Sequence, residues 1–201
     1  MKVCVVGHGP SLKGAKLGKQ IDACDKVVRL KNCQMLLAEP HNYGKKTDVM
    51  CSSTEVMTNM HKVKASEYWG APKALTHNQA RIENFRRRVK GEVLVFQELM
   101  DLWNAFFLEL GGKHKNVSTG LAAVIISLDR YKPDTVVLAG FDKVLNPSSE
   151  GYQCTVPTPF NDDGRRDTGH DWQTELAMLP YLGAAYEAEI VSIDSRYHFR
   201  P

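Results

Sequence analysis

The sequence has 201 residues, which is enough for one sizeable hydrophobic core and short for two. Its 43% hydrophobic and 24% charged residues describe an ordinary soluble globular protein. The formal net charge of +3 suits an anionic ligand such as a nucleotide, but it is far from the basic load of a dedicated DNA-binding protein.

Short β-branched runs alternate with longer helical patterns, and the near-continuous apolar character of the short runs predicts strands covered on both faces. In chain order we predict strands at 2–7, 26–30 and 47–51, a helix at 53–64, a strand at 73–76, a helix at 79–90, a strand at 92–96, helices at 98–110 and 118–131, a strand at 135–140, a helix at 171–187 and a strand at 189–193. This alternation predicts an α/β fold, a single Rossmann-like domain over 1–201 with a mostly parallel central sheet of about seven strands flanked by helices. The Pro-, Ser-, Asp- and Gly-rich segment 143–169 is predicted to be a lid or mobile loop.

The apolar stretches are too short for a membrane span or a signal peptide. The longest, 121–128, falls well below the roughly 20 residues that a spanning helix needs. The five cysteines are odd in number and form no C-x-x-C pair, so neither zinc spacing nor a disulfide framework is present. We therefore expect a cytoplasmic protein without a membrane anchor.

A glycine turn, VVGHGPSLKG, follows the first predicted strand, with Gly7, Gly9 and Gly14. Glycine lets backbone N–H groups approach a phosphate closely, at the strand end where ligands bind in such sheets. The dinucleotide fingerprint fails because Leu12 occupies its third glycine position, and a Walker loop fails because Gly14 stands where Ser or Thr is required. The turn indicates a nucleotide-type ligand; the alternative is a tight strand-to-helix turn with Ser11 as a cap.

A Ser-Thr-Gly turn precedes the predicted helix 118–131. Ser118 and Thr119 are both good N-caps, so a capped helix is the simpler interpretation. Hydroxyl groups and free N–H groups at a helix N-terminus also form a phosphate site, and both interpretations stay open.

The segment HDWQTE, residues 170–175, begins the predicted helix 171–187. His170 and Glu175 are five positions apart, about 140° out of line on a helix, so they do not form the pair that zinc helices use. Trp172, Leu176 and Leu179 form one apolar stripe, so the helix begins at or just after His170. An imidazole at the helix mouth can accept a proton, and Glu175 suits a supporting role.

Taken in order, three stretches resemble the sialylmotifs of the animal-type sialyltransferases. CVVGHGPSLKGAKLGKQIDACDKVVRLK (4–31) resembles the large motif, NVSTGLAAVIISLDRYKPDTVVLAGFD (116–142) the small motif, and HDWQTE (170–175) the very small motif. YGKKTDV (43–49) resembles the segment that follows the large motif, and the matched blocks cover a little over a third of the chain.

This resemblance implies a sialyltransferase-like variant of the GT-A fold. It implies inverting, metal-independent transfer of sialic acid or a related sugar from a CMP-activated donor to an acceptor hydroxyl, without a further cofactor. His170 would be the general base, and Ser118, Thr119 and Gly120 would hold the donor phosphate. The nucleotide and donor site would be lined by Gly7, His8, Gly9, Pro10, Ser11, Arg29, Lys31, Asn32, Gly140, Phe141 and Asp142.

The sequence departs from the family at several of these positions. His8 and Lys31 stand where the family usually has Asn, so the donor sugar and nucleotide stay open, and the adjacent Asn32 is a possible compensation. The aromatic, His-bearing third motif is absent, with Tyr152 as a weak substitute. Arg165 and Arg166 would suit a phosphate or a carboxylate-bearing sugar.

The acceptor is open as well. A glycan is the family default. One alternative is a phage-type enzyme that glycosylates a hydroxylated DNA base from a different nucleotide sugar, with the Arg run at 86–88 as faint support. Another is a nucleotide-binding module without turnover. The missing anchor favours a bacterial or phage relative.

Overall fold

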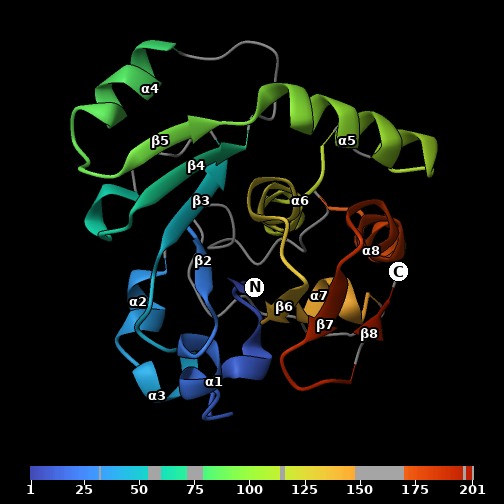
Figure 1. Ribbon diagram of the computed structural model, residues 1–201, viewed down its shortest axis with the longest axis horizontal. Helices are drawn as coiled ribbons and strands as arrows, with labels where there is room; N and C mark the ends of the chain where they lie inside the picture. The colour runs from blue at the N-terminus through green and yellow to red at the C-terminus, as the bar shows by residue number, and fades with distance from the viewer. Residues whose placement is uncertain are drawn as a thin grey trace, which may run out of the picture.

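The computed structural model describes residues 1–31, 33–53, 60–71, 79–113, 116–147, 170–196 and 198–200. One sheet crosses the molecule with the strand order β5-β4-β3-β2-β1-β6-β7-β8 (Figure 1). Its strands are β1 (Lys2–Val6), β2 (Lys26–Leu30), β3 (Val49–Ser53), β4 (Glu67–Ala71), β5 (Glu92–Val95), β6 (Thr135–Ala139), β7 (Glu189–Ser192) and β8 (His198–Phe199). All neighbouring strands are parallel except β8, which runs antiparallel to β7.

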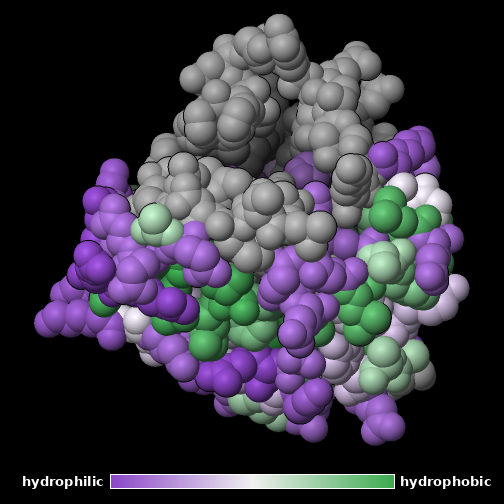
Figure 2. Space-filling model, turned by 90° about the horizontal axis from the view of Figure 1, so that it is seen from above, coloured by the Kyte–Doolittle hydropathy of each residue, from purple (hydrophilic) through white to green (hydrophobic). Residues whose placement is uncertain are grey.

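Helices cover both faces of this sheet and divide its core in two. One face packs against the 3₁₀ turn η1 (Pro10–Leu12) and helices α1 (Gly18–Asp22), α2 (Gln34–Leu37), α3 (Pro40–Tyr43) and α4 (Gln79–Arg86). The other packs against α5 (Gln97–Glu109), α6 (Thr119–Tyr131), α7 (Asp142–Leu145) and α8 (Trp172–Tyr186). Figure 2 views the molecule from the side of α4, β5 and α5. The hydrophobic residues on this face gather in patches bordered by hydrophilic residues.

Helix α6 is the central helix of the second layer. Every residue from Leu121 to Leu128 is buried, because the helix packs against β1, β2, β3, β4 and β6. A helix that is apolar on all sides is stable only in such a position. Its N-terminus is fixed by Ser118, whose side chain accepts a hydrogen bond from the Leu121 N–H.

The strand order reverses at β1, and this creates the place where a ligand is expected. The chain lays down β1 to β5 in one direction and then returns to place β6 on the other side of β1. Val6 and Ala139 are register partners at the ends of these two strands. Ligands of open α/β sheets bind outside the carboxyl ends of the strands at such a switch point.

The predicted fold class is confirmed, with specific differences in the elements. The strand predicted at 73–76 lies outside the described residues, and β4, at Glu67–Ala71, was not predicted because Glu67 and Gly70 interrupt its apolar pattern. The small strand β8 was also missed. The predicted helix 53–64 is wrong where it is described, since Ser53 ends β3 and only residues 60–62 form a 3₁₀ turn.

The predicted loop 143–169 begins inside α7, and its residues 148–169 lie outside the described part of the chain. None of the helices in the described segments is long and apolar enough to span a membrane.

Candidate active site

The loops that follow β1 and β6 touch each other at the switch point. The Gly7 N–H donates to the Ala139 carbonyl at 2.7 Å, and the Gly9 N–H donates to the Gly140 carbonyl at 2.8 Å. A Cβ atom on either Gly7 or Gly9 would lie 2.6 Å from the Gly140 oxygen, closer than real side chains approach. The glycines are therefore needed for contact between the loops. The N–H groups of Gly7 and Gly9 have these carbonyls as acceptors, so a phosphate at the turn would have to use other N–H groups.

The outer part of the same loops is exposed. Pro10 and Ser11 are both accessible, and the Ser11 N–H donates to Asp142 Oδ2 at 3.1 Å. Leu12, which replaces the third glycine of a dinucleotide fingerprint, is fully buried in the core. This turn therefore has its own packing and presents Pro10, Ser11 and Asp142 at the carboxyl edge of the sheet.

Phe141 joins the two glycine turns that the sequence singled out. A Cβ atom on Gly7 would lie 3.3 Å from Phe141 Cδ2, and one on Gly120 would lie 3.2 Å from Phe141 Cε1. The ring is 5% exposed, so it packs between the first turn and the start of α6. The structure thus brings residues 7–11, 118–120 and 140–142 together, as the family motifs imply.

His8 and Lys31, the two departures from the family pattern, are both half-buried at the ends of adjacent strands. Burial lowers the pKa of His8 to about 4, and the positive charge of Lys31 contributes in the same direction. His8 is therefore neutral at pH 7, with one N–H donor and one acceptor nitrogen.

Arg29 has a different position from the one expected. Its side chain is fully buried, and its Nε donates to the Lys46 carbonyl at 2.9 Å and to Thr47 Oγ1 at 3.1 Å. Its Nη2 donates to the Tyr43 carbonyl at 2.8 Å. Arg29 braces the segment that leads into β3, so it does not line the exposed part of the switch point. The other expected contacts Asn32, Tyr152, Arg165 and Arg166 lie outside the described residues.

A buried carboxylate ties the start of α6 to α8. Glu175 has no exposed surface; its Oε1 accepts the Ser118 N–H and its Oε2 accepts the Ser118 hydroxyl, both at 2.7 Å. The same hydroxyl accepts the Leu121 N–H at 3.2 Å. Ser118 is thus fully engaged as a helix cap, whereas Thr119 and Gly120 remain half-buried beside it.

The residue after His170 forms another tie, between α8 and the segment that follows α5. Asp171 is the N-cap of α8: its Oδ1 accepts the Thr174 N–H at 3.3 Å, and its Oδ2 accepts the Lys113 N–H at 3.2 Å. Burial alone would raise the pKa of Asp171, but these hydrogen bonds outweigh it and the pKa is lowered. His170 is half-buried, and its ring centroid lies 4.6 Å from that of Trp172.

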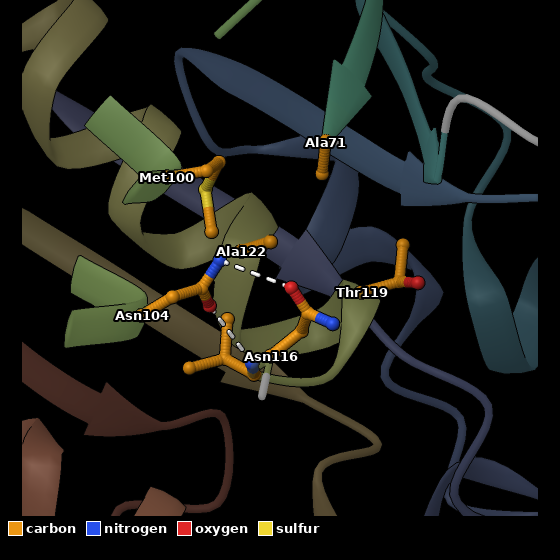
Figure 3. Close-up of a pocket in the computed structure, with 7 residues that line it drawn as sticks. Ala71, Met100, Asn104, Asn116, Thr119 and Ala122 are labelled. Atoms are coloured by element: carbon orange, nitrogen blue, oxygen red, sulfur yellow. Dashed lines mark hydrogen bonds between the residues drawn. The ribbon is translucent and has the colours of Figure 1, made fainter. Parts of the chain in front are cut away.

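Asn104 on α5 is a site-positioning residue that the sequence did not reveal. Its Oδ1 accepts the Val117 N–H at 3.0 Å, and its Nδ2 donates to Asn116 Oδ1 at 3.3 Å (Figure 3). The amide therefore fixes the two residues that precede Ser118. The available sequence signal was a single polar residue among the apolar positions of one face of α5, and the structure leaves Asn104 only 7% exposed.

A small cavity lies beside this amide. It has a volume of about 10 Å³, room for one water molecule, and it is lined by Ala71, Met100, Asn104, Asn116, Val117, Thr119 and Ala122 (Figure 3). Within the described residues, no group of three or more His, Cys, Asp or Glu side chains is arranged to hold a metal ion.

Comparison with known proteins identifies the family. The model of glycosyltransferase family 29 (sialyltransferase) matches residues 1–185. A mammalian sialyltransferase in complex with Gal-beta-1-3GalNAc-ortho-nitrophenol has a TM-score of 0.65 and 21% identity, and a second mammalian sialyltransferase structure has 0.63 and 20%. Each alignment covers 94% of this chain and 68% of the other.

These two structures have the same fold as this chain, and at such low sequence identity they support no conclusion beyond the fold. A search of curated proteins finds no match. The family model, however, spans nearly the whole sequence. The chain therefore belongs to glycosyltransferase family 29, the sialyltransferases.

Proposed function

We propose that this glycosyltransferase moves sialic acid or a related acidic sugar from CMP to an acceptor hydroxyl, with inversion and without a metal ion. The observation that carries the proposal is the double hydrogen bond between Ser118 and Glu175. It fastens α8 to the start of α6, and so brings the segment that carries His170 to a helix N-terminus suited to a phosphate.

The nucleotide would bind at the switch point. The neutral imidazole of His8 has one donor and one acceptor, as the Asn amide of other family members has, so it can replace that amide in pairing with a base or ribose. Lys31, at the end of the neighbouring strand, would supply a positive charge for the phosphate.

The donor phosphate would sit at the N-terminus of α6. The first N–H groups of a helix have no acceptor within it. That of Leu121 is capped by Ser118, and those of Thr119 and Gly120 have no acceptor among the described residues. These two N–H groups, the Thr119 hydroxyl and the helix dipole would stabilise the charge that develops on the departing CMP.

His170 is the proposed base because the adjacent carboxylates are already engaged. Asp171 accepts two backbone N–H groups, and Glu175 accepts two hydrogen bonds from Ser118. In the proposed step, the acceptor oxygen attacks the anomeric carbon opposite the phosphate, and His170 takes the hydroxyl proton. The carbon–oxygen bond to phosphate breaks, and CMP leaves with the electron pair.

A glycan is the proposed acceptor. The Arg run at 86–88, the feature that would support DNA binding, ends α4 and leads toward the amino end of β5. This is the edge of the sheet opposite the switch point. Arg86 and Arg87 both pair with Glu83, at 3.7 Å, so part of the run is a solvated helix face.

The test compares wild type, His170→Ala and Gln173→Ala in transfer from CMP-sialic acid to a panel of glycans. Gln173 is exposed on the same helix and serves as the matched control. We expect His170→Ala to lose about 10²–10⁴-fold in kcat while CMP still raises the melting temperature. Full activity of His170→Ala would refute the base assignment. Stabilisation by UDP but not by CMP would refute the donor assignment.

A further inference from the structure

A second, open recess lies away from the switch point. It has a volume of about 430 Å³, within the range of small-ligand sites, and it is lined by Gln34, Leu37, Lys45, Thr47, Lys62, Val63 and Lys64. Three of these seven residues are lysines, and none is acidic. We call it the lysine recess.

The lysine recess is distinct from the proposed donor site. Lys45 and Thr47 precede β3, and Lys62 and Lys64 precede β4, so these four residues lie toward the amino edge of the sheet, while Gln34 and Leu37 belong to α2, the helix that follows β2. The Gly7 and Gly140 loops follow β1 and β6 at the carboxyl edge. A ligand in the recess would therefore leave the switch point accessible.

Two acidic side chains that contact the segment 45–48 are hydrogen-bonded to backbone N–H groups. Both oxygens of Asp22 accept the Lys45 N–H at 2.9 Å, and its Oδ1 also accepts the Lys46 N–H at 2.9 Å. Asp48 accepts the Val27 N–H at 2.8 Å and pairs with Lys46 Nζ at 3.8 Å. Within the described residues, the three ammonium groups that line the recess form no ion pair.

A fourth positive charge lies directly behind the wall. Thr47 Oγ1, which lines the recess, accepts from the fully buried Arg29 guanidinium at 3.1 Å. The other acceptors of Arg29 in the described part of the chain are the neutral carbonyls of Tyr43 and Lys46. A buried charge is weakly screened, so its field adds to that of the lysines, reduced by the nearby charge of Asp22.

We propose that the lysine recess binds the phosphate group of a small phosphate ester. Lysine ammonium groups are compact charges that suit a phosphate dianion, whereas planar, two-toothed recognition of a carboxylate favours arginine, which is absent from the lining. Leu37 and Val63 provide an apolar wall for the organic part of the ester. The proposal does not depend on the transfer reaction.

The test measures binding of ribose 5-phosphate by calorimetry at low salt, with inorganic phosphate and acetate as comparison ligands. The variant Lys62→Glu/Lys64→Glu is compared with Lys2→Glu/Lys19→Glu. The control carries the same charge change on two exposed lysines that do not line the recess. Thermal unfolding checks that both variants fold.

We expect binding to weaken about tenfold or more in the recess variant and by less than about threefold in the control, because only the first reverses charges beside the ligand. The CMP-induced thermal shift should be equal in both variants. Equal loss of ribose 5-phosphate binding in both would show a net-charge effect and overturn the proposal. Absence of binding to wild type, or acetate binding as tightly as phosphate, would overturn it as well.

Discussion

Replacing Glu175 should uncouple the two halves of the proposed active site. Hydrogen bonds to a charged group contribute about 1.5–3 kcal/mol each, so the two bonds to Ser118 suggest a gross loss of about 3–6 kcal/mol. The cost of burying the carboxylate disappears with it, which reduces that loss. We therefore expect Glu175→Ala to lower the free energy of unfolding by about 3 kcal/mol. Glu175→Gln should cost less, because its amide retains one acceptor for the Ser118 N–H.

Urea unfolding of wild type, Glu175→Ala, Ser118→Ala and the double variant would measure this contribution. The cycle should give a coupling energy of about 1–2 kcal/mol, because Ser118→Ala removes the hydroxyl and leaves the backbone N–H in place. Gln173→Ala, on the exposed side of the same helix, should stay within about 0.5 kcal/mol of wild type. A Glu175→Ala protein as stable as wild type, or a coupling energy near zero, would refute the reasoning.

Three further predictions follow from individual contacts. Burial lowers the pKa of His8 to about 4, so the contribution of neutral His8 to stability should be complete above the unfolded-state pKa of about 6.5 and lost as the pH falls toward 4. In urea unfolding, the free energy of unfolding should fall less between pH 7 and pH 5 in His8→Asn than in wild type, and an identical fall in both would contradict this. Gly9→Ala should lower stability by about 2–4 kcal/mol, because its Cβ would collide with the Gly140 carbonyl and the Asp142 carboxylate; an unchanged melting temperature would show that the loops can separate freely. Asn104→Leu should lower the free energy of unfolding by about 1–3 kcal/mol by leaving the buried Val117 N–H without its acceptor; an unchanged stability in urea unfolding would refute this role.

Sequence periodicity was sufficient to predict most strands of the sheet, because buried parallel strands have continuous apolar sequences. It failed at β4, where Trp69 is completely buried but Glu67 and Gly70 break the run. Glu67 belongs there because it receives hydrogen bonds from Trp69 Nε1 at 3.0 Å and Tyr131 Oη at 2.7 Å, partners that no local pattern reveals.

The sequence predicted which segments form the candidate site, but it predicted less well what each residue in those segments does. The order of the motifs placed residues 7–11, 118–120 and 140–142 together. The sequence did not show that Gly7 and Gly9 pack loop against loop, or that the Arg29 side chain turns away into the core. These outcomes depend on partners distant in sequence. Asn104 is the same case, since its importance lies in Val117 on another segment.

The ring of Phe141 makes the two glycine turns depend on each other. A Cβ atom on Gly120 would lie 3.2 Å from the ring and one on Gly7 would lie 3.3 Å from it, so a larger residue at 120 would push the ring toward the first turn, whereas position 7 is closed by the Gly140 oxygen at 2.6 Å. Positions 120 and 141 should therefore covary among related sequences. A larger residue at 120 should be tolerated best where the residue at 141 has become smaller.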